Sequence, residues 1–252
     1  MRSKVPLSVL LAALLAASVL AGPVAAVDSG PMDAPEESEV GSEFDATYEL
    51  TDLFTDFERW TLVGETEIES VTWTVTQYDQ AGNQVAQESY DGQEFSQEID
   101  IESGVSRVEV RITGTTPAFE TPNYDPPQRF SAASFTLNRQ GGTQQDIASY
   151  ETHHFTQESR SARQDIDEAS EVVGQSSNDG SQETLQRAIS AYNAGNYDNA
   201  NQLAEEAENE AQQSQRNRTL LLYGGAAVVV GLLIGVGFYV YQSRKQGPSR
   251  LR

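Results

Sequence analysis

The chain has 252 residues, no cysteine, and 38 acidic against 16 basic residues, which gives a net charge of −22 at pH 7. Without cysteine, disulfides, thiol catalysis and thiolate metal sites are excluded. A charge this negative argues against a nucleic-acid partner, because phosphate binding requires lysine and arginine concentrated on one face.

Residues 1–26 have the pattern of a secretion signal. A basic start precedes an apolar core over residues 5–20, and small residues follow at 24–26. This order predicts cleavage after Ala26, so that the mature chain begins at Val27. No twin arginine precedes the core, which favours the Sec route. The alternative is an anchor helix that is not cleaved.

Residues 27–42 are polar and acidic and contain two prolines. Such a composition buries too little apolar surface to offset the entropy of ordering. It predicts a disordered acidic leader.

Apolar residues then recur at every second position through residues 43–140, with turn-forming dipeptides between the runs. In the clearest run Val71, Trp73 and Val75 alternate with threonines, which is the period of a half-buried strand. About seven such strands predict an antiparallel β-sandwich of immunoglobulin-like type, with Trp60 and Trp73 in its core. The pattern resembles the immunoglobulin-like and PKD-like modules of archaeal surface proteins.

The connection over residues 113–129 contains four prolines and carries Phe119 and Tyr124. Because proline cannot occupy a central strand, this segment is predicted to be a loop. One interpretation is a stiffened binding loop that exposes both aromatics. The other is a crossover whose aromatics cover the edge of the core.

Residues 141–218 change to the apolar spacing of amphipathic helices. Residues 191–207 resemble part of a tetratricopeptide repeat, and four residues fall at that family's spacing: Tyr192, Gly195, Tyr197 and Ala200. A stacked array requires at least three repeats, and only one copy is present. We therefore expect a three-helix unit that acts as a stalk or, alternatively, as a docking surface. Its predicted apolar stripes contain Ala162, Ile166, Ala169, Val173, Leu185, Ala188, Ile189, Tyr192, Tyr197, Ala200, Leu203, Ala204, Ala207 and Ala211.

Residues 219–241 contain no charge and are long enough for a transmembrane helix. The basic tail over residues 242–252 is expected in the cytoplasm, since positive residues beside a span remain inside. The protein is thus predicted to cross the cell membrane once, with its N-terminal part extracellular. Ala227, Gly231 and Gly235 share one face of the span, and their small side chains favour self-association.

The segment 27–218 carries 38 acids against 10 bases, a net charge of −28, and all ten bases are arginine. This composition resembles that of secreted proteins from extremely halophilic archaea. The resemblance implies a salty habitat, because a domain so charged repels itself in dilute buffer. At 1 M salt the Debye length falls to about 3 Å and the repulsion is largely screened.

No residue cluster predicts catalysis, a cofactor or a metal. His153 and His154 are the only histidines, and Glu158 would share a helical face with His154. Two ligands without a third favour a polar surface over a zinc site. Close acidic pairs are expected from the number of acids alone, and no nucleophile elbow, phosphate-binding loop or dinucleotide fingerprint occurs.

These features predict a non-enzymatic, membrane-anchored cell-surface protein of a halophile that binds other envelope proteins or glycans. The alternative is an accessory subunit of a membrane transport or secretion complex. A hydrolase with scattered carboxylates is the third hypothesis.

Overall fold

The computed structural model describes residues 27–139, 142, 144–176, 178–217, 219, 234 and 236. These form two compact units, which we call the sandwich (residues 27–119 and 129–155) and the helical unit (residues 120–128 and those from 156 onward). The predicted signal and tail, and nearly all of the predicted span 219–241, lie outside the described residues. No helix in the described part of the chain is both long and apolar enough to cross a membrane.

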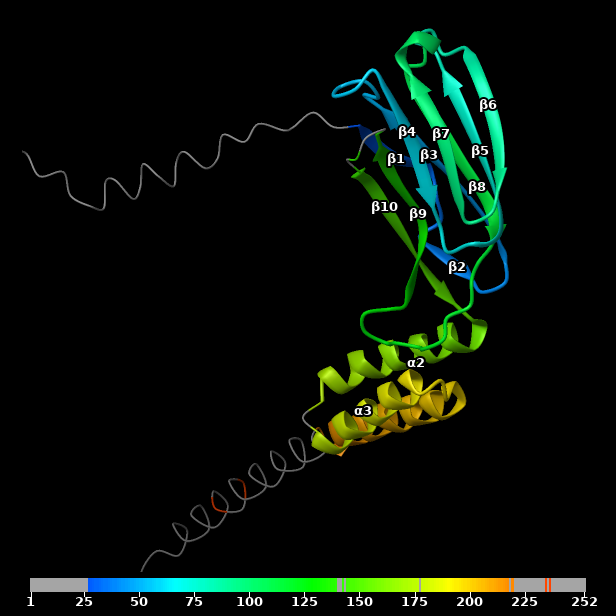
Figure 1. The fold of residues 1–252 in the computed structure, drawn as a ribbon. Helices are drawn as coiled ribbons and strands as arrows, with labels where there is room; N and C mark the ends of the chain where they lie inside the picture. Colours follow the sequence, from blue (N-terminus) through cyan, green and yellow to red (C-terminus); the bar gives the residue numbers. More distant parts are fainter. Residues whose placement is uncertain are drawn as a thin grey trace, which may run out of the picture. The chain divides into compact units, whose positions relative to one another are not determined.

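The sandwich contains two five-stranded sheets (Figure 1). The first has the order β1 (Asp28–Asp33), β3 (Glu43–Thr51), β8 (Arg107–Thr115), β5 (Glu69–Tyr78), β6 (Gln84–Asp91). The second has the order β2 (Glu37–Glu39), β10 (Gln144–Phe155), β9 (Arg129–Asn138), β4 (Arg59–Glu65), β7 (Glu94–Asp100). All pairs are antiparallel except β2 with β10, and a short 3₁₀ helix, η2 (Ile101–Ser103), follows β7. The predicted β-sandwich with additional helices is confirmed.

The core lies between the two sheets and follows the predicted alternation. Trp60 and Trp73 are both buried, as expected from the sequence. The ring centre of Trp73 lies 4.9 Å from that of Phe95, which joins the two sheets through aromatic contact. The rings of Tyr48 and Phe135 meet edge-on at 5.5 Å and make a second contact between the sheets.

The prediction of a disordered leader over residues 27–42 is wrong. Strand β1 pairs with β3 from Asp28 opposite Thr51, and the three-residue β2 pairs with β10. Both are edge strands that join through backbone hydrogen bonds, which need no apolar side chains. Composition alone therefore missed them.

The boundary predicted at residues 140–141 is also wrong, because strand β10 continues the sandwich to Phe155. Its most deeply buried positions include Thr152 and His154 in place of aliphatic residues. For this reason residues 144–155 show no alternation of apolar side chains from which β10 could be predicted. The predicted shared helical face of His154 and Glu158 does not exist, since the histidine lies in β10.

The helical unit contains α2 (Gln157–Gly174), α3 (Asp179–Asn193) and a third helical segment over residues 197–217. Thr156 caps α2 in a capping box with Ser159. Gly195, with φ of 75°, supplies the left-handed turn before the third segment. The predicted stripes are confirmed: nearly all of their members are buried in one cluster, and Ile189, Tyr197 and Leu203 pack against it.

Candidate functional site

The sandwich has a hollow at one end, which we call the tip. It has a volume of about 850 Å³ and lies among the loops that follow β3, β5 and β7. The strand register places Asn138 opposite Thr61, near this end, and Arg129 opposite His153 at the other. The tip hollow therefore opens away from the end at which β10 leaves the sandwich. Its lining residues are Asp52, Leu53, Phe54, Thr55, Asp79, Gln80, Ala81, Ile101, Gly104, Val105 and Ser106.

Apolar and acidic groups lie side by side in the tip hollow. Ile101 is 44% exposed and Phe54 is half-buried. The carboxylate of Asp79 is held by its own turn, where it accepts hydrogen bonds from the Asn83 side chain at 2.9 Å and backbone at 2.8 Å. These bonds hold the pKa of Asp79 below its ordinary value, the side-chain bond contributing most. Asp79 is thus a fixed anion and an unsuitable proton donor at neutral pH.

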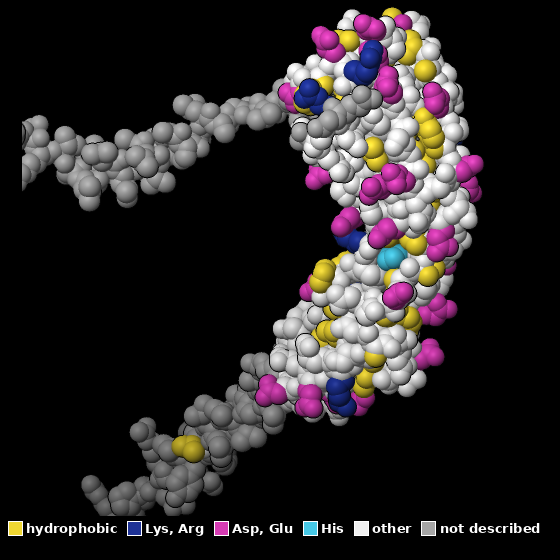
Figure 2. All heavy atoms as spheres, viewed as in Figure 1, with side chains coloured by type: hydrophobic (Ala, Val, Ile, Leu, Met, Phe, Trp, Pro, Cys, Tyr) yellow, Lys and Arg dark blue, Asp and Glu magenta, His cyan; other side chains and the backbone are white. Residues whose placement is uncertain are grey.

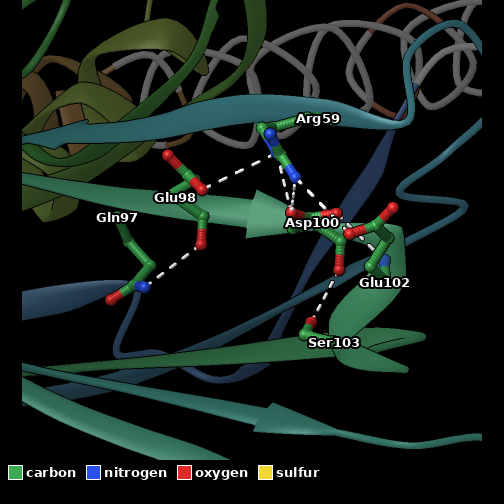
Figure 3. A network of polar contacts seen from close by, with 6 residues as sticks. All are labelled: Arg59, Gln97, Glu98, Asp100, Glu102 and Ser103. Carbon is green, nitrogen blue, oxygen red and sulfur yellow. Dashed lines mark hydrogen bonds and ion pairs between the residues drawn. The ribbon is translucent and has the colours of Figure 1, made fainter.

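An ion-pair network borders the tip (Figure 3). Arg59, in β4, donates from Nε to Asp100 Oδ2 at 2.7 Å and lies 3.8 Å from carboxylate oxygens of Glu98 and Glu102. Asp100 also accepts from the backbone N–H of Glu102 at 2.9 Å, which caps η2. That backbone bond contributes most to lowering the pKa of Asp100, and the hydrogen bond from Arg59 lowers it further against the opposing effect of desolvation. The network orients η2, which carries Ile101, although exposed ion pairs themselves add little stability.

Phe119, the first predicted loop aromatic, is a half-buried part of the sandwich. Its ring centre lies 5.2 Å from that of His154, and Pro117 O lies 3.0 Å from His154 Nδ1. His154 is only 4% exposed, so the predicted polar surface at this position is wrong. Burial, more than any other influence, lowers the pKa of His154.

Tyr124, the second loop aromatic, is half-buried within the helical unit. Its backbone N–H donates to Asn193 Oδ1 at 2.7 Å, and its hydroxyl donates to Asp167. The guanidinium carbon of Arg163 lies 4.7 Å from the ring centre, and the ring of Tyr192 meets it edge-on at 5.8 Å. Burial and the bond to Asp167 raise the pKa of Tyr124.

The two aromatics predicted to form one binding loop therefore belong to different units and both are packed. These placements favour the crossover interpretation of residues 113–129. The sequence did not predict the tip hollow. Ile101 continues the apolar alternation of β7, and that pattern indicates a buried residue, not an exposed one. Ala227, Gly231 and Gly235 lie outside the described residues, and the contact face remains a prediction.

Among the described residues, no three of His, Asp and Glu are grouped so that they could hold a metal ion.

No protein-family model matches the chain, and no curated protein sequence matches it. Among solved structures, Spo0M, a sporulation control protein from Bacillus subtilis, is 14% identical, with a TM-score of 0.29 over 58% of this chain and 55% of that protein. A cohesin module of a family 33 glycoside hydrolase from Clostridium perfringens is 14% identical, with a TM-score of 0.26 over 52% of this chain and 98% of the module. The SrpA adhesin from Streptococcus sanguinis is 15% identical, with a TM-score of 0.24 over 54% and 61%. Similarities this weak carry no argument about family or function.

Proposed function

We propose that this protein is a non-enzymatic, membrane-anchored surface protein of a halophile. Its immunoglobulin-like sandwich binds another envelope protein or a glycan at the tip. The observation that carries the proposal is the tip hollow, in which the exposed Ile101 and the half-buried Phe54 share the lining with Asp52 and Asp79. Exposed apolar groups rimmed by polar ones are typical of contact surfaces.

The position of the tip supports this role. The chain leaves the sandwich at Phe155, at the end opposite the hollow, and continues toward the helices and the predicted membrane helix over residues 219–241. A partner at the tip is therefore not obstructed by the chain's own exit. The helical unit serves in this proposal as the stalk.

The surface chemistry supports a saline exterior. Figure 2 shows Asp and Glu side chains spread over the visible face with few Lys or Arg side chains among them. Two bases of the first sheet are paired with carboxylates: Arg107 lies 2.8 Å from Glu49, and Arg111 donates to Asp45 at 2.9 Å. Free carboxylates in excess repel one another unless salt screens them.

The test is photo-cross-linking in intact cells, with a photoreactive amino acid at position 101. We expect one defined adduct from Ile101 and none from Met32, the matched control, which is 55% exposed and lies toward the end of β1 that is farther from the tip. Ile101→Ser should remove the partner from complexes purified in high salt, whereas Met32→Ser should retain it. Equal behaviour at the two positions would refute the tip as the binding surface.

The alternative, an accessory subunit of a membrane transport or secretion complex, predicts a different pattern. There the contact is made by the membrane helix, so that Gly231→Ile releases the partner and Ile101→Ser does not. Protease added to intact cells tests the topology common to both proposals: it should remove the sandwich, and protection of the sandwich would contradict both.

A further inference from the structure

Strand β6 forms one border of the first sheet, and its outer side has no neighbouring strand in the described part of the chain (Figure 1). Gly92 donates a backbone hydrogen bond to Val71 O at 3.1 Å, which fixes the phase of the ladder between β5 and β6. In an antiparallel ladder, residues that bond to the neighbour alternate with residues whose backbone groups point away from it. The backbone N–H and C=O groups of Gln87, Ser89 and Asp91 therefore point outward, and within residues 27–139 and 144–155 these groups have no hydrogen-bond partner.

The other edges of the sandwich are better protected against further pairing. β1 contains Pro31, which has no N–H, and its register shifts between Pro31 and Asp33. β2 pairs with the last three residues of β10, and the rest of β10 has register shifts at two places. β7 carries three acidic side chains in seven residues. Proline, bulges and charge are devices that keep an edge strand from joining another chain. In β6 the register shift lies at the turn that precedes it, so residues 86–91 form a regular edge.

We infer that β6 pairs with β6 of a second copy of this chain, antiparallel and about a two-fold axis at Ser89. In this register Gln87 of each copy lies opposite Asp91 of the other, and Glu88 lies opposite Tyr90. Both carboxylates thus face uncharged polar side chains. The Tyr90 hydroxyl lies 2.8 Å from Glu88 Oε2 within one chain, so these two groups are compatible neighbours. Moving the axis to Glu88 would place that residue opposite itself, an arrangement that like charges disfavour.

The charge pattern of β6 favours its own copy over other occupants. Residues 87–91 have the sequence QESYD, and two copies that run in opposite directions place each acid against Gln or Tyr. A basic strand would meet more carboxylates at the β7 edge, so that edge suits it better. The remaining surfaces of two copies repel each other at long range, since residues 27–218 carry a net charge of −28. Pairing is therefore expected where salt screens this repulsion.

Pairing through β6 joins the two first sheets, each of five strands, into one continuous sheet. Because the two-fold axis reverses the strand direction, the tips of the two copies lie at opposite ends of the joined sheet. The pair thus presents two tip hollows that open in opposite directions, and it can bridge two partner molecules. This last consequence rests on the proposed function, whereas the pairing itself does not.

Site-directed cross-linking tests the pairing, because the chain contains no cysteine and one introduced cysteine reports one position. The full chain with Ser89→Cys is purified in detergent at about 1 M salt, where the Debye length is about 3 Å. Every variant also carries Gly231→Ile, so that the predicted contact between membrane helices cannot bring two copies together. Residues opposite each other in a hydrogen-bonded pair have Cα atoms about 5.5 Å apart, which suits a disulfide. The matched control is Ser96→Cys, at an exposed position of the β7 edge.

We expect mild oxidation to link the Ser89→Cys variant into dimers and to leave the Ser96→Cys variant monomeric. Charge at position 87 then tests the register, because this position faces Asp91 twice about the axis. In the chain without cysteine, Gln87→Glu should weaken the dimerisation constant, measured by sedimentation equilibrium, by about 2- to 30-fold. Gln87→Lys should strengthen it by a similar factor. The same changes at Ser96 should alter it less than about twofold, since salt screens charges that are not in contact.

Equal disulfide yields at positions 89 and 96, or a dimerisation constant that does not respond to charge at position 87, would overturn the inference. A cross-link in intact cells from Ser89→Cys to a different protein, and not to a second copy, would also overturn it. Urea unfolding followed by tryptophan fluorescence establishes that each variant is folded, because both tryptophans of the chain lie in the core of the sandwich. These outcomes are separate from the test of the proposed function, which is made at Ile101.

Discussion

Gly64 lies where β4 pairs with β7, the edge strand of the second sheet, and it provides the sharpest test of the packing. Gly64 in β4 lies directly opposite Phe95 in β7. A Cβ added at Gly64 would lie 2.1 Å from Phe95 Cε1 and 2.8 Å from Cδ1. The ring cannot retreat easily, because Phe95 is 3% exposed, with its ring centre 4.9 Å from that of Trp73 and 5.5 Å from that of Tyr90.

Gly64→Ala should therefore destabilise the sandwich. Overpacking of a filled core costs about 1–3 kcal/mol, and each disturbed aromatic pair costs about 0.5–1.5 kcal/mol more. The smaller entropy of the unfolded alanine chain returns about 0.4–1 kcal/mol. With both ring contacts of Phe95 disturbed, the expected net loss in the free energy of unfolding is about 1–5 kcal/mol.

Urea unfolding followed by tryptophan fluorescence measures this loss, since Trp73 contacts the displaced ring. Gly30→Ala is the matched control, because a Cβ at Gly30 in β1 has no atom within 4 Å. It should remain within about 0.5 kcal/mol of the parent. In the double variant Gly64→Ala/Phe95→Leu the two effects should be strongly non-additive, the smaller side chain relieving the clash. A loss below about 0.5 kcal/mol for Gly64→Ala, or additive effects, would refute the account of this contact.

Three further outcomes are expected. Tyr124→Phe should lower the stability of the helical unit by about 1 kcal/mol, measured by circular dichroism, because it removes the hydrogen bond to Asp167. Tyr197→Phe is the control and should be neutral, because the buried Tyr197 hydroxyl has no hydrogen-bond partner among the described residues. His154→Gln should reduce the loss of sandwich stability that occurs below pH 6.5. Burial lowers the pKa of His154 in the folded state, so the unfolded chain takes up the proton first as the pH falls. The parent should therefore lose up to about 1 kcal/mol of stability per pH unit from this residue. The prediction for His154 would be contradicted if the urea midpoints of parent and variant fell by the same amount between pH 7.5 and 5. The parent's urea midpoint should rise between about 0.1 M and about 1 M salt, as the Debye length falls from about 10 to 3 Å, and a midpoint that ignores salt would contradict the role given to the acidic surface.

The spacing of apolar residues along the chain was enough to predict which face of an individual strand or helix is buried. In β5 the alternation of Val71, Trp73 and Val75 with threonines predicts which face of the strand is buried, and all three residues are buried in the structure. The same holds for the alanines of the third helical segment, such as Ala200 and Ala204, which have no exposed surface. Spacing of 2 or 3.6 residues is a property of the chain alone, so it can be recognised without knowledge of the neighbours.

Only the tertiary structure shows that the edge strands β1 and β2 exist and where the aromatic residues of the 113–129 loop pack. The acidic β1 and β2 are strands because β3 and β10 offer them unpaired backbone groups, a condition set by residues far away in sequence. His154 is buried for the same reason, since its position at the end of β10 is fixed by pairing with Ser38 of β2. Tyr124 packs on the helices because Asp167, Arg163 and Asn193 meet it there. Such long-range partners leave no periodic pattern in the sequence, and they also bring together the three loops that form the tip hollow.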